Sequence, residues 1–226
     1  MMESIGKIFL YGLLIMGCVV SAEAQVSPAL QVPLETASGW GPIEPPAGFK
    51  ALRIQGRSTA STLVLAQLFA DFASHPAMFS RVVASVDILG CNSSTLKARY
   101  RTVFDPKPGG KTMVESLTTV RATVAEDRIE FVWNSDAIKS SYVNAASGRA
   151  MFITRQTRNG SETLIDYVSA IRPKNAAKGI LVESQKSVLA NDAKYVIDRL
   201  MAIAEQHKAD ATTAINSVNV FKCSGT

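Results

Sequence analysis

Apolar residues recur at helical spacing between Val188 and Lys208, which is the clearest periodic pattern in the chain. The apolar positions are Leu189, Ala193, Val196, Ile197, Leu200, Met201, Ile203 and Ala204. Intervals of three and four residues predict one buried face of an α-helix, and charged residues occupy the opposite side. A helix of about 20 residues is about 30 Å long, enough to cross a whole sheet. By itself the pattern is also typical of an ordinary core helix.

The region before it begins with one strand and two short helices. Phe49–Ser58 alternates polar and apolar residues and predicts a strand. Thr62–Phe72 has apolar residues at helical spacing after a polar stretch suited to an N-cap, and predicts a helix. His75 precedes Pro76, and a residue before proline avoids the helical region, so we expect a break there. A second short helix is predicted over Ala77–Val82.

A run of strands follows these helices. The predicted strands are Val83–Leu89, Thr95–Phe104, Lys111–Thr123, Arg128–Asn134, Gly148–Gln156 and Thr163–Arg172. Alternation places Tyr100 and Phe104 on one face of the second strand, and Phe131 and Trp133 on one face of the fourth. Asn159-Gly160 between the last two strands predicts a tight hairpin. Residues 176–186 lead into the long helix and are expected to be helical already.

The two ends of the chain differ from this central region. Lys7, an apolar run and Ala22-Glu23-Ala24 form the pattern of a secretory signal, so residues 1–24 are predicted to be removed after Ala24. Cys18 lies in a loose match to a bacterial lipobox, which leaves a lipid-anchored form as the alternative. Residues 25–48 read as a proline-rich leader, 49–208 as one folded domain, and 209–226 as a C-terminal tail. The expected location is therefore the periplasm or the exterior.

Export determines how the cysteines are interpreted. Once the signal is removed, Cys91 and Cys223 remain, and two thiols in an oxidising compartment are most simply paired. Two separate buried thiols are the alternative. The pattern contains no closely spaced cysteine or histidine ligands, so no metal site and no cofactor is predicted.

The net charge of +5 bears on possible partners. A basic surface can contact an anionic membrane transiently, or simply keep the protein soluble. Lysine and arginine are scattered along the chain, and export argues against a nucleic-acid partner, so none is predicted.

The order of these elements resembles the helix-grip fold of the START-type superfamily, also called SRPBCC. The resemblance covers roughly residues 49–208. It rests on the strand-to-helix junction 57–61, the corner at residues 70–76 followed by Met78-Phe79, the next strand, and the closing helix. It implies an α+β domain in which a curved antiparallel sheet wraps around the long C-terminal helix, with two short helices after the first strand.

The resemblance also implies a cavity between sheet and helix that holds a lipid or another apolar small molecule. The expected ligand-binding residues are Met78, Phe79, Tyr100, Phe104, Phe131, Trp133, Phe152, Tyr167, Leu200 and Met201. Each of these side chains can alternatively belong to a compact core. Trp133 is the strongest single candidate, because a buried indole N–H needs a hydrogen-bond partner.

Three functions fit this reading of the sequence. The first is an exported, non-catalytic carrier of a lipid or other apolar molecule. The second is a cyclase- or aromatase-like enzyme that uses a carboxylate facing the cavity, either Glu115 or Asp166, although the simpler interpretation is that both face solvent. The third is an envelope interaction module without a ligand. His75 and His207 do not form part of a recognisable catalytic set, and the absence of a paired acid and base favours the carrier.

Overall fold

The computed structural model describes residues 50–104, 111–158, 160–175, 178, 186–207, 220–221 and 223. Strand β1 (Lys50–Ser58) comes first, followed by α2 (Thr62–Ala70), a 3-10 turn η3 (Phe72–Ser74) and α3 (His75–Met78). The six further strands are β2 (Val83–Cys91), β3 (Thr95–Phe104), β4 (Thr112–Val124), β5 (Arg128–Lys139), β6 (Val143–Thr157) and β7 (Gly160–Pro173). Helix α5 (Lys186–Gln206) follows them. The predicted signal, leader and most of the tail lie outside the described residues.

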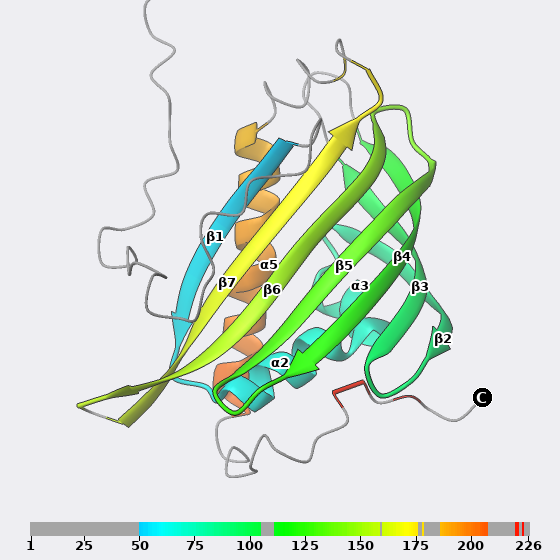
Figure 1. The fold of residues 1–226 in the computed structure, drawn as a ribbon. Coiled ribbons are helices and arrows are strands. Elements are labelled where there is room, and N and C mark those ends of the chain that lie inside the picture. Colours follow the sequence, from blue (N-terminus) through cyan, green and yellow to red (C-terminus); the bar gives the residue numbers. More distant parts are fainter. Residues whose placement is uncertain are drawn as a thin grey trace, which may run out of the picture.

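The seven strands form one antiparallel sheet in the order β1-β7-β6-β5-β4-β3-β2. Strands β2 to β7 are a simple meander, and β1 pairs with β7, with Lys50 opposite Ile171 and Ser58 opposite Thr163. The sheet is strongly curved, with α5 running along its concave side and α2 and α3 lying across one end (Figure 1). The predicted architecture is confirmed.

Helix α5 buries the apolar face that its spacing predicts. Ala193, Ile197, Leu200 and Ala204 are buried, whereas the charged positions between them are exposed. The helix packs against β1 at Gly56, where a Cβ would lie in ordinary contact, 3.4 Å from both Ile197 Cγ2 and Met201 Sδ. Glu205 adds a polar link, accepting hydrogen bonds from Ser58 Oγ (3.1 Å) and Thr59 Oγ1 (2.8 Å).

The small helices differ from the sequence prediction at the proline. Helix α2 starts as expected, because Ser61 Oγ accepts a hydrogen bond from the backbone N–H of Val64 (3.2 Å). The helix ends at Ala70, however, and His75 has helical angles (φ −54°, ψ −39°). Pro76 therefore lies in the first turn of α3, where its missing N–H removes no helical hydrogen bond. The break expected at His75 occurs instead at Asp71, and α3 is shorter and earlier than 77–82.

The strands are mostly longer than their patterns indicate. β5 continues to Lys139 and β6 begins at Val143. The prediction missed these extensions because their inward-facing residues, such as Ser135 and Ala145, are small or polar and do not show the aromatic alternation on which it relied. The predicted hairpin is confirmed: Thr157 pairs with Gly160, whose φ of 124° suits glycine. The predicted helical lead-in at 176–186 falls mainly outside the described residues, although Lys178 is helical.

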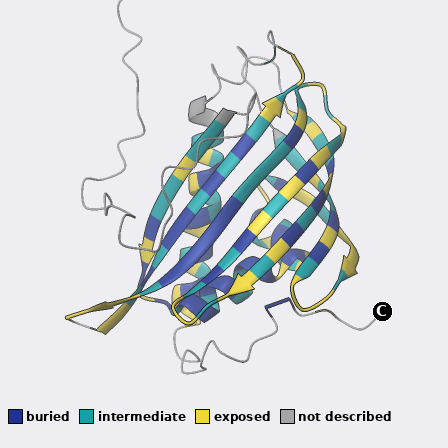
Figure 2. Ribbon diagram, viewed as in Figure 1, coloured by how far each residue is buried: buried dark blue, intermediate teal, exposed yellow. Residues whose placement is uncertain are grey.

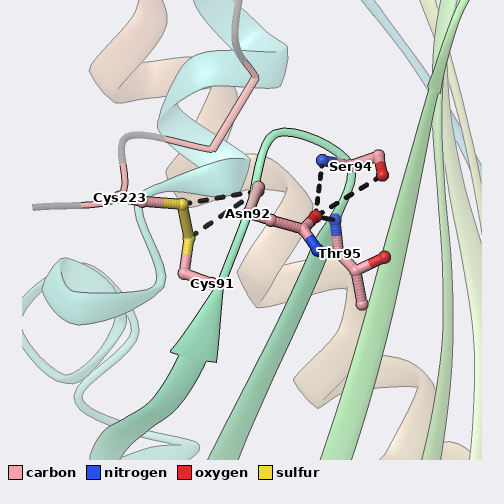
Figure 3. The surroundings of a disulfide bond; sticks show 5 residues. All are labelled: Cys91, Asn92, Ser94, Thr95 and Cys223. Carbon is pink, nitrogen blue, oxygen red and sulfur yellow. Dashed lines mark hydrogen bonds between the residues drawn. A yellow bond between two sulfur atoms is a disulfide. The ribbon is translucent and has the colours of Figure 1, made fainter. Parts of the chain in front are cut away.

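A disulfide joins Cys91, at the end of β2, to Cys223 in the C-terminal segment, as the sequence predicted (Figure 3). The bonded residues are 132 positions apart in sequence, with Cα atoms 5.6 Å apart. Beside them, the Asn92 side chain accepts hydrogen bonds from the backbone N–H groups of Ser94 (3.0 Å) and Thr95 (2.7 Å), closing the β2–β3 turn. The disulfide holds Phe221 in the core, where its ring lies 5.9 Å from that of Phe131.

Burial alternates along β4, whereas residues 149–153 of β6 are all buried (Figure 2). Along β4, Ser116, Thr118 and Val120 point inward and are buried, while Leu117 between them is 44% exposed. Among the described helices, none has the length and apolar character needed to cross a membrane.

Candidate ligand-binding cavity

The sheet and α5 do not close on each other along their whole length, and a cavity of about 310 Å³ remains between them. Its wall is formed by inward-facing residues of β1 and β3 to β7, by Phe69 of α2, by the 72–83 segment and by the N-terminal half of α5. The residues that line it include Phe72, His75, Phe79, Tyr100, Ser116, Thr118, Trp133, Ser135, Ala137, Tyr167, Leu189, Asp192 and Val196. Most of the wall is apolar, which is the usual character of a small-molecule site.

Phe79, Tyr100, Trp133 and Tyr167, which the sequence nominated, all lie on this wall. They come from the α3–β2 connection, β3, β5 and β7, so the fold brings together residues that are far apart in sequence. Trp133 and Tyr167 pack ring against ring, with centroids 5.5 Å apart. Position 148 opposite them must be glycine, because a Cβ there would lie 2.1 Å from Trp133 Cζ2.

Five of the other nominated residues do not line the cavity. Phe131, Phe152 and Leu200 are fully buried in the packed core. Helix α2 covers the sheet at that end, and the Phe69 ring lies 5.1 Å from Phe131 and 5.7 Å from Phe152. Met78 and Met201 pack partly buried against the same core, away from the wall. The side chain of Phe104 lies outside the described residues.

A buried histidine–tyrosine pair forms the most polar corner of the cavity. His75 Nε2 lies 2.9 Å from the Phe69 carbonyl oxygen, and Nδ1 lies 2.9 Å from Tyr100 Oη. A carbonyl only accepts hydrogen bonds, so Nε2 must carry the hydrogen. Nδ1 of the neutral ring is then an acceptor, and the Tyr100 hydroxyl donates to it.

Burial controls the protonation of these groups. Desolvation lowers the pKa of His75 from 6.5 to about 4, although the hydrogen bond to Phe69 and the charge of Asp71 act in the opposite direction. Burial, with a smaller contribution from neighbouring Tyr167, raises the pKa of Tyr100 well above 10. Burial also raises the pKa of Tyr167 to about 12. Near neutral pH the corner is therefore uncharged.

Hydroxyl groups make up a second polar region of the wall. Thr118 Oγ1 on β4 and Ser135 Oγ on β5 are 2.7 Å apart and hydrogen bond to each other. Ser116 lies on the same wall. A hydroxyl engaged with its neighbour still has acceptor capacity for a ligand or water. The polar groups are few and neutral, which suits a mostly apolar guest.

The two carboxylates proposed as catalytic lie on the outer face of the sheet. Glu115 is close to Arg101 Nε (3.5 Å) and Arg99 Nε (3.7 Å). Asp166 is buried, but it accepts hydrogen bonds from Arg53 Nε (2.6 Å) and Arg149 Nη2 (2.7 Å). Alternation explains both positions, because each carboxylate is next to inward-facing Ser116 or Tyr167 in its strand. Neither Glu115 nor Asp166 lines the cavity, so the alternative in which one of them serves a catalytic role there is not supported.

Sequence reasoning missed His75, Phe72 and Asp192 as wall residues. Asp192 of α5 borders the cavity and pairs with Arg81 of the α3–β2 connection at 2.8 Å, and the Arg81 guanidinium also lies 5.3 Å from the Tyr195 ring centre. Helical spacing places Asp192 next to Leu189 and Val196, a signal that could have found it. No three His, Cys, Asp or Glu side chains in the described part of the chain cluster as metal ligands would.

Comparison with known proteins bears on the fold. No protein-family model and no curated protein matches the sequence. Among solved structures, the Zhui aromatase/cyclase from Streptomyces sp. R1128 is similar over 70% of this chain and 95% of its own, with 13% identity and a TM-score of 0.55. The di-domain aromatase/cyclase StfQ of the steffimycin biosynthetic pathway is similar over 71% of this chain and 52% of its own, with 12% identity and a TM-score of 0.52.

The chain has the START-type helix-grip fold. A START superfamily protein from Mycobacterium smegmatis is also similar, with 14% identity and a TM-score of 0.47 over 70% of this chain and 98% of its own. At these identities the likeness extends to the fold alone, since one fold supports many functions. What this helix-grip domain does must therefore be argued from its own cavity.

Proposed function

We propose that this protein is an exported, non-catalytic carrier that binds a lipid or another apolar small molecule between the sheet and α5. The observation that supports this most directly is the 310 Å³ cavity with its largely apolar wall. Such a volume lies at the lower end of the range typical of ligand pockets, about 300–1,000 Å³. The predicted signal at residues 1–24 supports the exported location.

The state of the polar groups on the wall supports carriage over catalysis. Asp192 is the one carboxylate among the described wall residues, and it is paired with Arg81. His75 is held neutral between Phe69 and Tyr100, and its lowered pKa makes it a weak base. His75 therefore does not resemble a general base poised near neutral pH.

A cyclase-like enzyme is the second candidate, because two similar structures are named aromatase/cyclases and the His75–Tyr100 pair borders the cavity. In such an enzyme Tyr100 would have to hydrogen bond to a reacting oxygen. Its raised pKa makes the phenol reluctant to ionise, so it would act as a neutral group rather than as a base.

Extraction and mass spectrometry of the purified protein test the carrier proposal. We expect an apolar molecule to co-purify with the protein in stoichiometric amount. This molecule should itself stay chemically unchanged through repeated cycles of loading and release. A protein that yields no apolar molecule, and binds none when incubated with a lipid extract, would contradict the proposal. Conversion of an extracted molecule into a new product, abolished in Tyr100→Phe, would favour the enzyme instead.

A further inference from the structure

The chain of hydrogen bonds at the polar corner of the cavity has a fixed direction. The Phe69 carbonyl can only accept, so the hydrogen on the neutral His75 ring is on Nε2. His75 Nδ1 can then only accept, so the hydroxyl hydrogen of Tyr100 is directed at it. The single donor of Tyr100 is thus used inside the protein.

The phenolic oxygen of Tyr100 keeps its acceptor capacity, and Tyr100 and His75 both border the cavity. We propose that Tyr100 selects ligands that carry a hydrogen-bond donor, such as an alcohol or phenol on an apolar body, over equally large ligands that can only accept. This inference rests on the proposed function and adds the chemical class of the ligand.

The alternative direction would need a charged or differently protonated histidine. A hydrogen on Nδ1 of a neutral ring would leave Nε2 without one, so Nε2 and the Phe69 carbonyl would both be acceptors facing each other at 2.9 Å. That contact would be repulsive in a site where His75 is only 5% exposed. Burial also disfavours the doubly protonated ring, so the arrangement holds at neutral pH.

The discrimination arises from the cost of an unpaired acceptor. A ligand hydroxyl placed against Tyr100 Oη makes a hydrogen bond in a dry site. A ligand carbonyl or ether at the same position brings two acceptors together. Its oxygen also loses the hydrogen bond that it made with water in solution. Sites that hydrogen bond a ligand group reject analogues lacking it, because buried polar groups remain unpaired.

Two probes of nearly equal shape test the inference. We would titrate the purified protein at pH 7.5 with 2-naphthol, which can donate, and 2-methoxynaphthalene, which can only accept. The wild type should bind 2-naphthol about tenfold more tightly, the discrimination expected for one buried hydrogen bond. Tyr100→Phe should bind both equally. Tyr195→Phe, which removes a tyrosine hydroxyl from α5 away from the described wall, should keep the wild-type preference.

The outcomes separate this inference from the proposed function. Equal binding of both probes to the wild type, or an unchanged preference in Tyr100→Phe, would overturn the donor inference and leave the carrier proposal intact. Binding of neither probe would count against the carrier proposal itself.

Should Tyr100→Phe fail to fold, a wider ligand series in the wild type decides the question. Naphthalen-2-ylmethanol must then group with 2-naphthol, and 2-naphthaldehyde with 2-methoxynaphthalene. Grouping of these ligands by size or polarity instead of by donor capacity would contradict the inference.

Discussion

The interior of this domain has two halves that are built from the same strands but packed differently. At one end α2, the second half of α5 and Phe221 press on the sheet, and Phe69, Phe131 and Phe152 fill the space. At the other end the first half of α5 faces Trp133, Ser135 and Ala137 across empty volume. The comparison shows that the cavity lies where the first half of α5 and the 72–83 segment leave the concave face incompletely filled.

Phe131 and Trp133 allow the packing of the two halves to be compared on a single strand. They lie two residues apart on the inward face of β5, but only Trp133 borders the cavity. We expect Phe131→Ala to lower the free energy of unfolding by about 3–5 kcal/mol, the usual cost of deleting a fully packed aromatic ring. Trp133→Ala should cost less, because part of its ring already faces empty space. Urea unfolding of both variants measures the difference, and an equal or larger cost for Trp133→Ala would mean that the two halves are equally packed.

His75 connects the two halves and makes stability depend on pH. Its pKa is about 4 in the folded protein and near 6.5 when unfolded, so between these values the unfolded chain binds more protons. Stability should therefore fall as the pH is lowered from about 7 to 4, with a contribution from His75 of about 3 kcal/mol.

Urea unfolding at several pH values would measure this slope. His75→Gln, which cannot titrate, should be less stable at pH 7 but should lose less stability on acidification. Identical slopes for the variant and the wild type would show that His75 is not buried in its neutral form.

Removal of the disulfide tests whether the densely packed half, which contains Phe69, Phe131 and Phe152, depends on the C-terminal segment. Phe221 is placed against Phe131 and Phe72 by the bond between Cys91 and Cys223. Cys91→Ser with Cys223→Ser should lower the free energy of unfolding by about 2–4 kcal/mol, because the cross-link constrains a long loop in the unfolded chain. Comparison of thermal unfolding with the wild type, oxidised and reduced, would measure this loss. A variant as stable as the oxidised wild type would show that the bond adds nothing to the packing of this end.

Substitution of Gly148 tests the half of the interior that contains the cavity, next to Trp133. A methyl group at this position would clash with Trp133 at 2.1 Å and with the Val168 carbonyl oxygen at 2.4 Å. Gly148→Ala should displace the indole, distort the pairing of β6 with β7 at Val168, and weaken binding of an apolar probe by about tenfold or more, which corresponds to about 1.4 kcal/mol. Trp133 fluorescence would shift at the same time. Unchanged probe affinity and emission would contradict the placement of this ring.

Much of the fold could be predicted from the sequence, because the relevant signals are local. The spacing of Leu189 to Ala204 identifies α5 and its buried face, and alternation in β3 and β5 identifies the inward residues. The predicted export signal and the count of thiols led to the Cys91–Cys223 pair, and the structure contains that bond.

The site could be predicted only in part, because the cavity is a property of packing between distant elements. Alternation puts Phe131 and Trp133 on the same face, but it does not show that Phe69 and Phe221 enclose Phe131 while Trp133 borders empty space. Local rules also misread His75: the restriction before proline suggested a break, whereas Pro76 lies in a first turn that tolerates it. The partnership of His75 with Tyr100, 25 residues away, had no local signal.

Ala137 and Ile138 allow the most direct test of whether the cavity binds an apolar ligand. They are neighbours on β5, but Ala137 lines the cavity and Ile138 is 50% exposed on the outer face. Titration with the fluorescent apolar probe N-phenyl-1-naphthylamine would compare the wild type with Ala137→Phe and Ile138→Phe. If the space between β5 and α5 is a binding site, the wild type and Ile138→Phe bind the probe and Ala137→Phe binds at least tenfold more weakly. Equal affinity in all three folded proteins would contradict it.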